Sequence, residues 1–405
     1  MNHRACIILS RLSPYLFTAF GGLALSLLAA CHDRDALPAP PVVWATPTEI
    51  LGAPPDIIRP PWLVAGGVMV VTSDTESYNR SFVKLDQEDG SVLDRWDPQD
   101  GYSVGNGNKY VHGSVMAYTS YDNRFVRIFD TDRMEVAHDF PLPGTATYIS
   151  GLGPNVFALQ AVSYTNSRVW QINLNTYAAR PLFTTADTDT SFFGFVTLPV
   201  PYLNDQLDTG LLMLARPSDR FSLNRFALIN YSVAHPERSD TIWLPRYFDT
   251  NNPPVFTVYD QGMAVCSDLE NNQLVGVDIS RKQVAWVRKT NNWQGSDWPV
   301  AGDGKFYVAA SSFVCLDITT GETIWENQEG DYGIQWGSNT DLTYSFPVIF
   351  LGNIALSAST GAPLWDALDE YNADKLPFWG KATVDNLKER VYYSGKHSVY
   401  AIRHP

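Results

Sequence analysis

The chain has 405 residues, of which 45% are hydrophobic, 13% aromatic and only 18% charged. This composition excludes an intrinsically disordered chain and is typical of a folded β protein. The formal net charge of −14 at pH 7 argues against nucleic acid and anionic lipid headgroups as partners, because both are bound through clustered Lys and Arg side chains.

Residues 1–30 have the features of a secretory signal. Arg4 and Arg11 supply positive charge, residues 12–30 carry none, and the apolar run ends in the sequence LAAC at Cys31. Small residues before a cleavage point are typical of such signals. We therefore expect residues 1–30 to be absent from the mature protein.

The LAAC sequence resembles the lipoprotein box of bacteria, in which the cysteine becomes the lipidated first residue. The resemblance implies that the Cys31 thiolate accepts a diacylglycerol group and that residues 31–41 form a short tether. His32 follows the cysteine, and the absence of Asp there resembles the outer-membrane default. The chain would then be anchored in the outer membrane, facing the periplasm, with the lipid as its only membrane contact. An ordinary signal peptide or a short membrane anchor is the alternative.

From residue 42 onwards the sequence repeats a hairpin pattern, whose clearest copy is FVCLDITTGETIWE, Phe313 to Glu326. Two alternating apolar runs flank a short turn, as in paired antiparallel strands. Asp317 can accept hydrogen bonds from the backbone of the turn, and Gly321 can take the positive φ that closes it.

The pattern recurs along the chain with an Asp, or a substitute for it, at the start of each turn. Successive turn residues are 39 to 57 residues apart, which is the range of propellers and other repeat arrays. The predicted turn residues are 86, 130, 173, 230, 278, 317, 357 and 403. The repeat is best defined by Asp86, Gly90, Asp278, Trp286, Asp317, Gly321, Trp325, Gly361 and Trp365.

Each period also has room for two earlier strands, as in PPWLVAGGVMVVTS at 60–73. Four short strands in each period of about 40–45 residues are typical of a propeller blade. The eighth unit ends after its third strand, and PVVWATP at 41–47 resembles the fourth strands of other units. We therefore predict an all-β, eight-bladed β-propeller of four-stranded antiparallel blades over residues 42–405, closed by an N-terminal strand.

The repeat resembles that of the pyrroloquinoline-quinone-type propellers, whose consensus hairpin is Ala/Val-x-Leu-Asp-x-x-Thr-Gly-x-x-x-Trp. The match is close in the sixth unit, fair in the fifth and seventh, and poor in the second to fourth. The resemblance implies a propeller fold with tryptophans that dock between neighbouring blades. In blade number, anchor and repeat type the chain also resembles the propeller lipoproteins of outer-membrane barrel-assembly machinery.

No catalytic or metal-binding motif stands out, so we predict no catalytic residue, metal or cofactor. Beyond residue 31 the cysteines are Cys266, in a predicted second strand, and Cys315, in a third. Two buried thiols are expected, with a disulfide as the alternative. Quinoprotein dehydrogenases with this repeat use pyrroloquinoline quinone with calcium, vicinal cysteines and an Asp base. This chain has no Cys-Cys pair and no motif for that base.

Aromatic residues gather in three predicted connectors, at 289–299, 327–341 and 368–381. Loops from a fourth strand to the next first strand share one face of a propeller, and aromatics with polar neighbours make adaptable binding surfaces. Burial beneath the next strand is the alternative. The predicted aromatic rim consists of Trp293, Trp298, Tyr332, Trp336, Tyr371, Phe378 and Trp379.

The sequence thus favours a non-catalytic, monomeric scaffold that binds other envelope proteins, in envelope or outer-membrane protein assembly. A propeller that binds a sugar or another small ligand is the first alternative. A quinoprotein dehydrogenase is the second, because it shares only the repeat type.

Replacement of Cys31 by Ser tests the anchor. We expect Cys31→Ser to leave a longer, uncleaved precursor and to abolish labelling by a clickable fatty acid, because the hydroxyl cannot replace the thiolate. Gel mobility and in-gel fluorescence measure both effects, and labelling equal to that of the unaltered chain would contradict lipidation at Cys31.

Overall fold

The computed structural model describes most of the chain after residue 39. The described residues are 40–52, 60–73, 80–98, 104–120, 122–142, 145–163, 166–184, 192–195, 199–204, 206–217, 226–245, 257–268, 273–289, 299–309, 312–328, 342–352, 354–366, 378–395 and 398–405.

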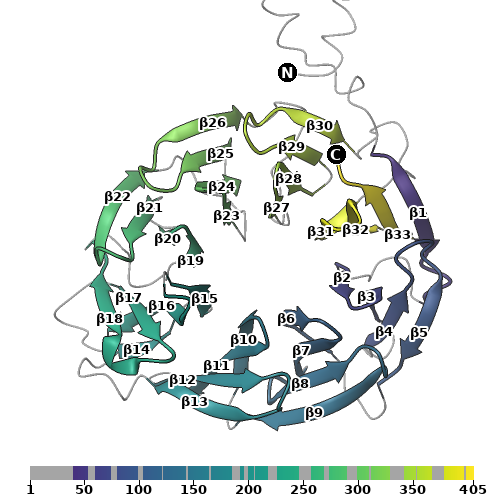
Figure 1. Cartoon of the computed structure of the whole chain (residues 1–405), viewed down its shortest axis with the longest axis horizontal. Helices are drawn as coiled ribbons and strands as arrows, with labels where there is room; N and C mark the ends of the chain where they lie inside the picture. Colours follow the sequence, from purple (N-terminus) through teal and green to yellow (C-terminus); the bar gives the residue numbers. More distant parts are fainter. Residues whose placement is uncertain are drawn as a thin grey trace, which may run out of the picture.

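These residues form eight antiparallel sheets arranged in a closed ring, which is the predicted eight-bladed propeller (Figure 1). Blade one consists of β2(Trp62–Val64), β3(Gly67–Ser73), β4(Arg80–Leu85) and β5(Val92–Trp96), and blade two of β6(Val104–His112), β7(Val115–Ser120), β8(Phe125–Asp130) and β9(Glu135–Pro141). Blade three consists of β10(Thr145–Leu152), β11(Asn155–Ser163), β12(Asn166–Asn173) and β13(Ala179–Thr184). Blade four consists of β14(Phe192–Phe195), β15(Val200–Leu203), β16(Thr209–Pro217), β17(Ala227–Ser232) and β18(Asp240–Trp243), with the 3-10 helix η4(Pro236–Arg238). Blade five consists of β19(Thr257–Asp260), β20(Met263–Asp268), β21(Gln273–Asp278) and β22(Gln283–Lys289), and blade six of β23(Val300–Gly302), β24(Lys305–Ala309), β25(Ser312–Asp317) and β26(Thr323–Gln328). Blade seven consists of β27(Leu342–Ser345), β28(Val348–Leu351), β29(Ile354–Ser357) and β30(Pro363–Asp366). Blade eight consists of β31(Phe378–Asp385), β32(Arg390–Gly395), β33(Ser398–Arg403) and β1(Val42–Pro47).

Blade eight is made from both ends of the chain. β1 lies antiparallel to β33, where Trp44 faces Ala401, and the amide of Arg403 donates to the carbonyl of Pro41 at 2.9 Å. The N-terminal strand is therefore the outermost strand of the last sheet, beside the C-terminal strand (Figure 1).

Blades four and seven depart from the common pattern. In blade four the inner position is shared by β14 and β15, which pair with successive parts of β16. Blade seven has four strands of only four residues each and still forms a complete four-stranded sheet.

The core runs round the ring as eight clusters of buried side chains, each between two neighbouring blades. Third strands serve two clusters at once: Cys315 of β25 packs toward blade seven, and the next residue, Leu316, packs toward blade five. The alternation of a strand explains this arrangement. The outer strands have one exposed face, as in the alternating burial of β22.

Three seams share the predicted docking of a tryptophan on the turn of the next blade. Trp44 packs on Gly90, Trp286 on Gly321 and Trp325 on Gly361, and a Cβ added to any of these glycines would lie 2.5 to 2.7 Å from an indole atom. The indole Nε1 of each Trp donates to a turn carbonyl, at 3.0, 2.9 and 3.2 Å respectively. The acceptors are Gln87, Ile318 and Ala358.

A second hydrogen bond fixes each of these seams. The side chain two residues after the Trp donates to the carbonyl of the docked glycine: Thr46 to Gly90 at 2.6 Å, Arg288 to Gly321 at 2.8 Å and Asn327 to Gly361 at 2.9 Å. The turn is thus held by ring contact and by two of its carbonyls, which leaves little freedom between the blades.

Other blades fill the same two positions differently. Asp240 of β18 occupies the Trp position, opposite Asn230, and pairs with Lys282 in the Gly position of blade five at 2.8 Å. In blade two His138 occupies the Trp position and stacks on Tyr177, with ring planes 2° apart. The seam between blades seven and eight keeps Trp365, which is buried, but no described residue accepts a hydrogen bond from its Nε1.

The turn position four residues after the anchor takes a positive φ whether or not it is glycine. The angle is 73° at Gly90 and Gly321, 56° at Lys282 and 52° at Met134. The hairpin therefore requires this conformation, while the docked indole requires glycine.

One predicted turn residue, Asn230, is wrong by two positions. It lies inside β17, and Ser232 begins the turn instead, because its Oγ accepts the amide of His235 at 3.1 Å. The weak sequence pattern of this repeat hid a longer turn that contains η4.

Substitution of Gly90 and of Gly113 separates docking from backbone strain. Both have positive φ, but a Cβ at Gly90 meets the Trp44 ring at 2.5 Å and one at Gly113 meets nothing within 4 Å. We expect Gly113→Ala to cost about 1 kcal/mol and Gly90→Ala a further ~1–3 kcal/mol from overpacking. Urea unfolding measures both, and equal losses would contradict the docking argument.

Candidate functional site

The predicted aromatic rim is only partly within the described chain. Trp293, Trp298, Tyr332, Trp336 and Tyr371 lie outside the described residues. Phe378 and Trp379 begin β31, where their backbones face Gly395 and Ser394, so they belong to an inner strand and not to a connector.

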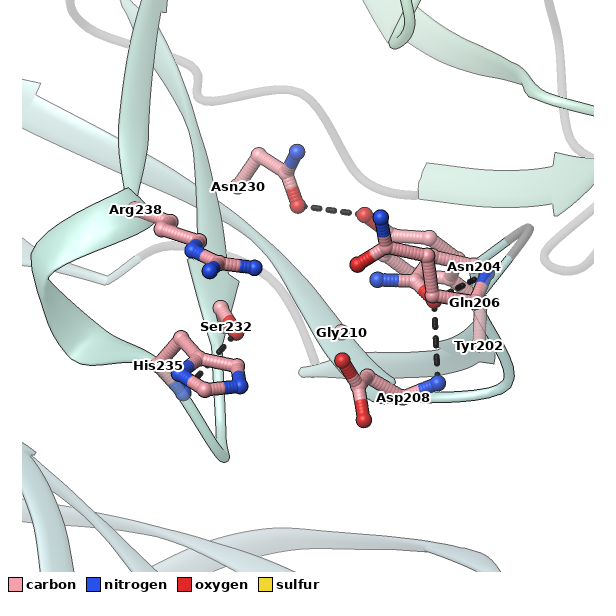
Figure 2. Close-up of a pocket in the computed structure, with 9 residues that line it drawn as sticks. All are labelled: Tyr202, Asn204, Gln206, Asp208, Gly210, Asn230, Ser232, His235 and Arg238. Atoms are coloured by element: carbon pink, nitrogen blue, oxygen red, sulfur yellow. Dashed lines mark hydrogen bonds between the residues drawn. The ribbon is translucent and has the colours of Figure 1, made fainter.

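A polar pocket of about 90 Å³ opens on blade four, at the ends of β15 and β17 (Figure 2). It lies on the face that carries the turns between first and second and between third and fourth strands. The connectors predicted to carry the aromatic rim come after the fourth strands β22, β26 and β30, whose ends lie at the opposite face of the ring. The lining residues are Tyr202, Asn204, Gln206, Asp208, Gly210, Asn230, Ser232, His235 and Arg238.

One wall, here the β15–β16 wall, consists of Asn204, Gln206 and Asp208. The Oδ1 of Asn204 accepts the backbone amides of Gln206 and Asp208, both at 2.9 Å, and the amide of Asn204 donates to the carbonyl of Asp208 at 3.0 Å. This side chain-to-backbone bonding is typical of Asn in turns. It fixes the wall and leaves the amide nitrogen of Asn204 directed into the pocket (Figure 2).

The opposite wall, here the η4 wall, consists of Ser232, His235 and Arg238. After the Ser232 turn, Pro236 starts η4 and the amide of Arg238 donates to the carbonyl of His235 at 2.8 Å. The short helix places the His235 and Arg238 side chains on the same side, facing the β15–β16 wall (Figure 2).

The base of the pocket joins the inner strand to the third strand. The hydroxyl of Tyr202 donates to Oδ1 of Asn230 at 2.5 Å. The Tyr202 ring lies so close to Gly210 that a Cβ there would be 2.4 Å from it. Gly210 thus lets the ring lie flat against β16. The side-chain Oδ1 of Asn230 therefore accepts a hydroxyl, whereas that of Asn204 accepts two backbone amides.

The two walls carry opposite charges that do not pair with each other. Asp208 is on one wall and Arg238 on the other, and no ion pair among the described residues joins them. Glu237, which does not line the pocket, lies 4.0 Å from Arg238 and 3.3 Å from His235. Among the described residues Asp208 therefore makes no ion pair, whereas Arg238 has only the long contact with Glu237.

Sequence reasoning missed this pocket, although one signal pointed to the blade. The interval from 173 to 230 is the longest in the repeat series. Both turns that form the pocket are longer than their equivalents in other blades. In blade six, for example, only Asp303 and Gly304 separate β23 from β24.

The two cysteines of the described chain lie in the core. Cys266 in β20 and Cys315 in β25 are free, fully buried thiols in the predicted strands. Among the described residues, no group of three or more His, Cys, Asp or Glu side chains could hold a metal ion. None of the helices in this part of the chain has the length and apolar character needed to span a membrane.

A scan of known protein families finds no match to this chain, and a search of curated protein sequences finds none. Solved structures are similar in fold. BamB from Moraxella catarrhalis is 14% identical, with a TM-score of 0.55 over 85% of this chain and 96% of its own. A europium-containing methanol dehydrogenase is 13% identical, with a TM-score of 0.59 over 88% and 85%. Saccharomyces cerevisiae Sqt1 is 8% identical, with a TM-score of 0.55 over 91% and 100%. These likenesses confirm the resemblance at the level of the fold.

The two thiols should resist alkylation in the folded protein. Burial raises the pKa of Cys266 and of Cys315 to about 12, so both stay protonated and covered at pH 8. We expect iodoacetamide to modify neither until urea is added, as measured by peptide mass mapping. Rapid modification of either thiol in the folded chain, or recovery of a disulfide-linked peptide pair, would contradict this prediction.

Proposed function

We propose that this protein is a non-catalytic scaffold of the bacterial cell envelope, anchored by a lipid on Cys31 and active in envelope or outer-membrane protein assembly. The observation that carries the proposal is the likeness to BamB, which extends over 96% of that chain. The LAAC sequence before the propeller supports the anchor, because it resembles the lipoprotein box of bacteria.

The construction of the ring suits a scaffold. Its seams are closed by buried clusters and by paired hydrogen bonds, so the loops are carried on a platform that changes little when a partner binds. A preorganised surface loses less conformational entropy on association. We assign partner binding to the aromatic rim, because tryptophans often dominate the binding energy of protein interfaces.

The test is capture of partners from the envelope with the full-length, lipidated chain. We expect an envelope protein to be enriched by the unaltered chain and to fall at least tenfold with the double variant Trp293→Ala/Trp336→Ala. The control is Phe346→Ala, because this aromatic is 67% exposed and follows the end of β27 that lies away from the connector between β26 and β27. Quantitative mass spectrometry gives the recoveries, and thermal melting verifies that each variant is folded.

A parallel titration separates the scaffold from a quinoprotein, the function class of the similar methanol dehydrogenase. Purified protein receives pyrroloquinoline quinone and calcium, and then alcohols or aldose sugars with an artificial electron acceptor. We expect no change in the cofactor spectrum and no reduction of the acceptor. Stoichiometric uptake with turnover would overturn the scaffold proposal. Equal recovery of the partner by the double variant and by the unaltered chain would show that the binding site is not on the aromatic rim.

A further inference from the structure

We propose that the pocket of blade four binds a zwitterion of amino-acid size, with the carboxylate at the η4 wall and the ammonium group at Asp208. This site lies on the face opposite the strand ends that carry the predicted rim, so it is independent of the scaffold proposal.

The separation of charge across the pocket is the first argument. Arg238 and Asp208 face the same space from opposite walls without pairing (Figure 2). A guanidinium presents two parallel N–H groups that match a carboxylate, and a carboxylate accepts well from an ammonium group. A ligand that carries both charges meets both walls at once, whereas a simple anion would leave Asp208 without a partner and a simple cation would leave Arg238 with only its long contact to Glu237.

The hydrogen-bonding groups support the same polarity. The Oδ1 atoms of Asn204 and Asn230 are occupied by the protein's own donors, so each amide offers its nitrogen as a donor. Together with Arg238 and the His235 ring, the site is rich in donors for a carboxylate. Asp208 is its one carboxylate and supplies the strong acceptor that an ammonium group needs. A neutral sugar, whose hydroxyls both donate and accept, would use this set less completely.

The size of the pocket fits such a ligand. A cavity of about 90 Å³ is several times the ~10–15 Å³ that holds one water molecule. It therefore has room for the ammonium and carboxylate groups of an amino acid. Gly210 keeps this room open, because a side chain there would push the Tyr202 ring outward.

The local construction indicates a built site and not a gap between irregular loops. Two turns of the same blade are unusually long, and each is held by an internal hydrogen bond to a side chain, that of Asn204 in one turn and that of Ser232 in the other. The tyrosine at the base is fixed by Asn230 and packs on Tyr259 of blade five, with ring centroids 4.3 Å apart. The side chains that line the pocket are thus positioned before any ligand arrives.

Isothermal titration of the purified full-length chain with L-alanine, and then with the other common amino acids, tests the proposal. We expect saturable binding of at least one amino acid. The N-acetyl and the amide derivatives of that amino acid, which lack one charge each, should bind at least tenfold more weakly. D-glucose is the neutral comparison, and we expect no saturable binding of it.

Two variants assign the binding to this pocket. Asp208→Asn preserves the size of the side chain, Arg238→Gln removes the charge and leaves a shorter polar side chain, and each should weaken binding at least tenfold. The control, Arg124→Gln, removes a guanidinium that is 75% exposed in the β7–β8 turn and should stay within twofold. Thermal midpoints verify folding. Amino-acid binding that is as tight in both pocket variants as in the unaltered chain would overturn the assignment. Failure of every amino acid to bind, or binding of glucose in their place, would overturn the ligand class.

Discussion

The contact between an indole ring and a bare glycine backbone is the constraint on which three of the eight seams of the ring depend. An outer strand contributes the Trp, and the turn of the next blade contributes the Gly, so neither blade can hold the contact alone. The 2.5–2.7 Å approach that a Cβ would make leaves no other residue at the turn position. Because two carbonyls of the same turn also accept hydrogen bonds from the neighbouring blade, the angle between the blades is set locally at each of these seams, and the eight angles of the ring must add to a closed circle.

The ring tolerates different chemistry at those positions, provided that both members change together. An ion pair, Asp240 with Lys282, replaces ring and glycine at one seam, and a stacked pair, His138 on Tyr177, replaces them at another. In blade one Lys84 donates to the carbonyl of Thr131 at 3.0 Å and so serves the acceptor that an indole serves elsewhere. These exchanges explain why the second to fourth repeats match the consensus poorly and still fold into blades.

The sequence predicts the fold well because the repeat signal is local and recurs. The turn at Asp317 and Gly321 could be derived from one hairpin, the docking of Trp325 was implied by the family resemblance, and the fourth strand missing from the eighth unit could be found at Trp44. The pocket could not be derived in that way. Asn204 and Arg238 belong to two turns of unusual length, so periodicity says nothing about how they meet, and the predicted anchor Asn230 lay two residues from the true turn. The rim prediction rested on connectors, which carry no repeat pattern, and five of its seven residues lie outside the described chain.

The position of β1 has a mechanical meaning under the proposed anchoring. The segment that would lead to the lipid continues directly into β1, the strand that closes the ring. A force on the lipid anchor would therefore act first on the hydrogen bonds between β1 and β33. Backbone bonds alone would give way one after another as an edge strand peels. Trp44 and Thr46 attach the same strand sideways to blade one, and Lys388 and Arg390 hold Glu88 across that seam. Their hydrogen bonds also lower the pKa of Glu88, which keeps it ionised. Tension on the tether would thus be shared between two blades, so the contacts that close the ring would also be the contacts that hold it to the membrane.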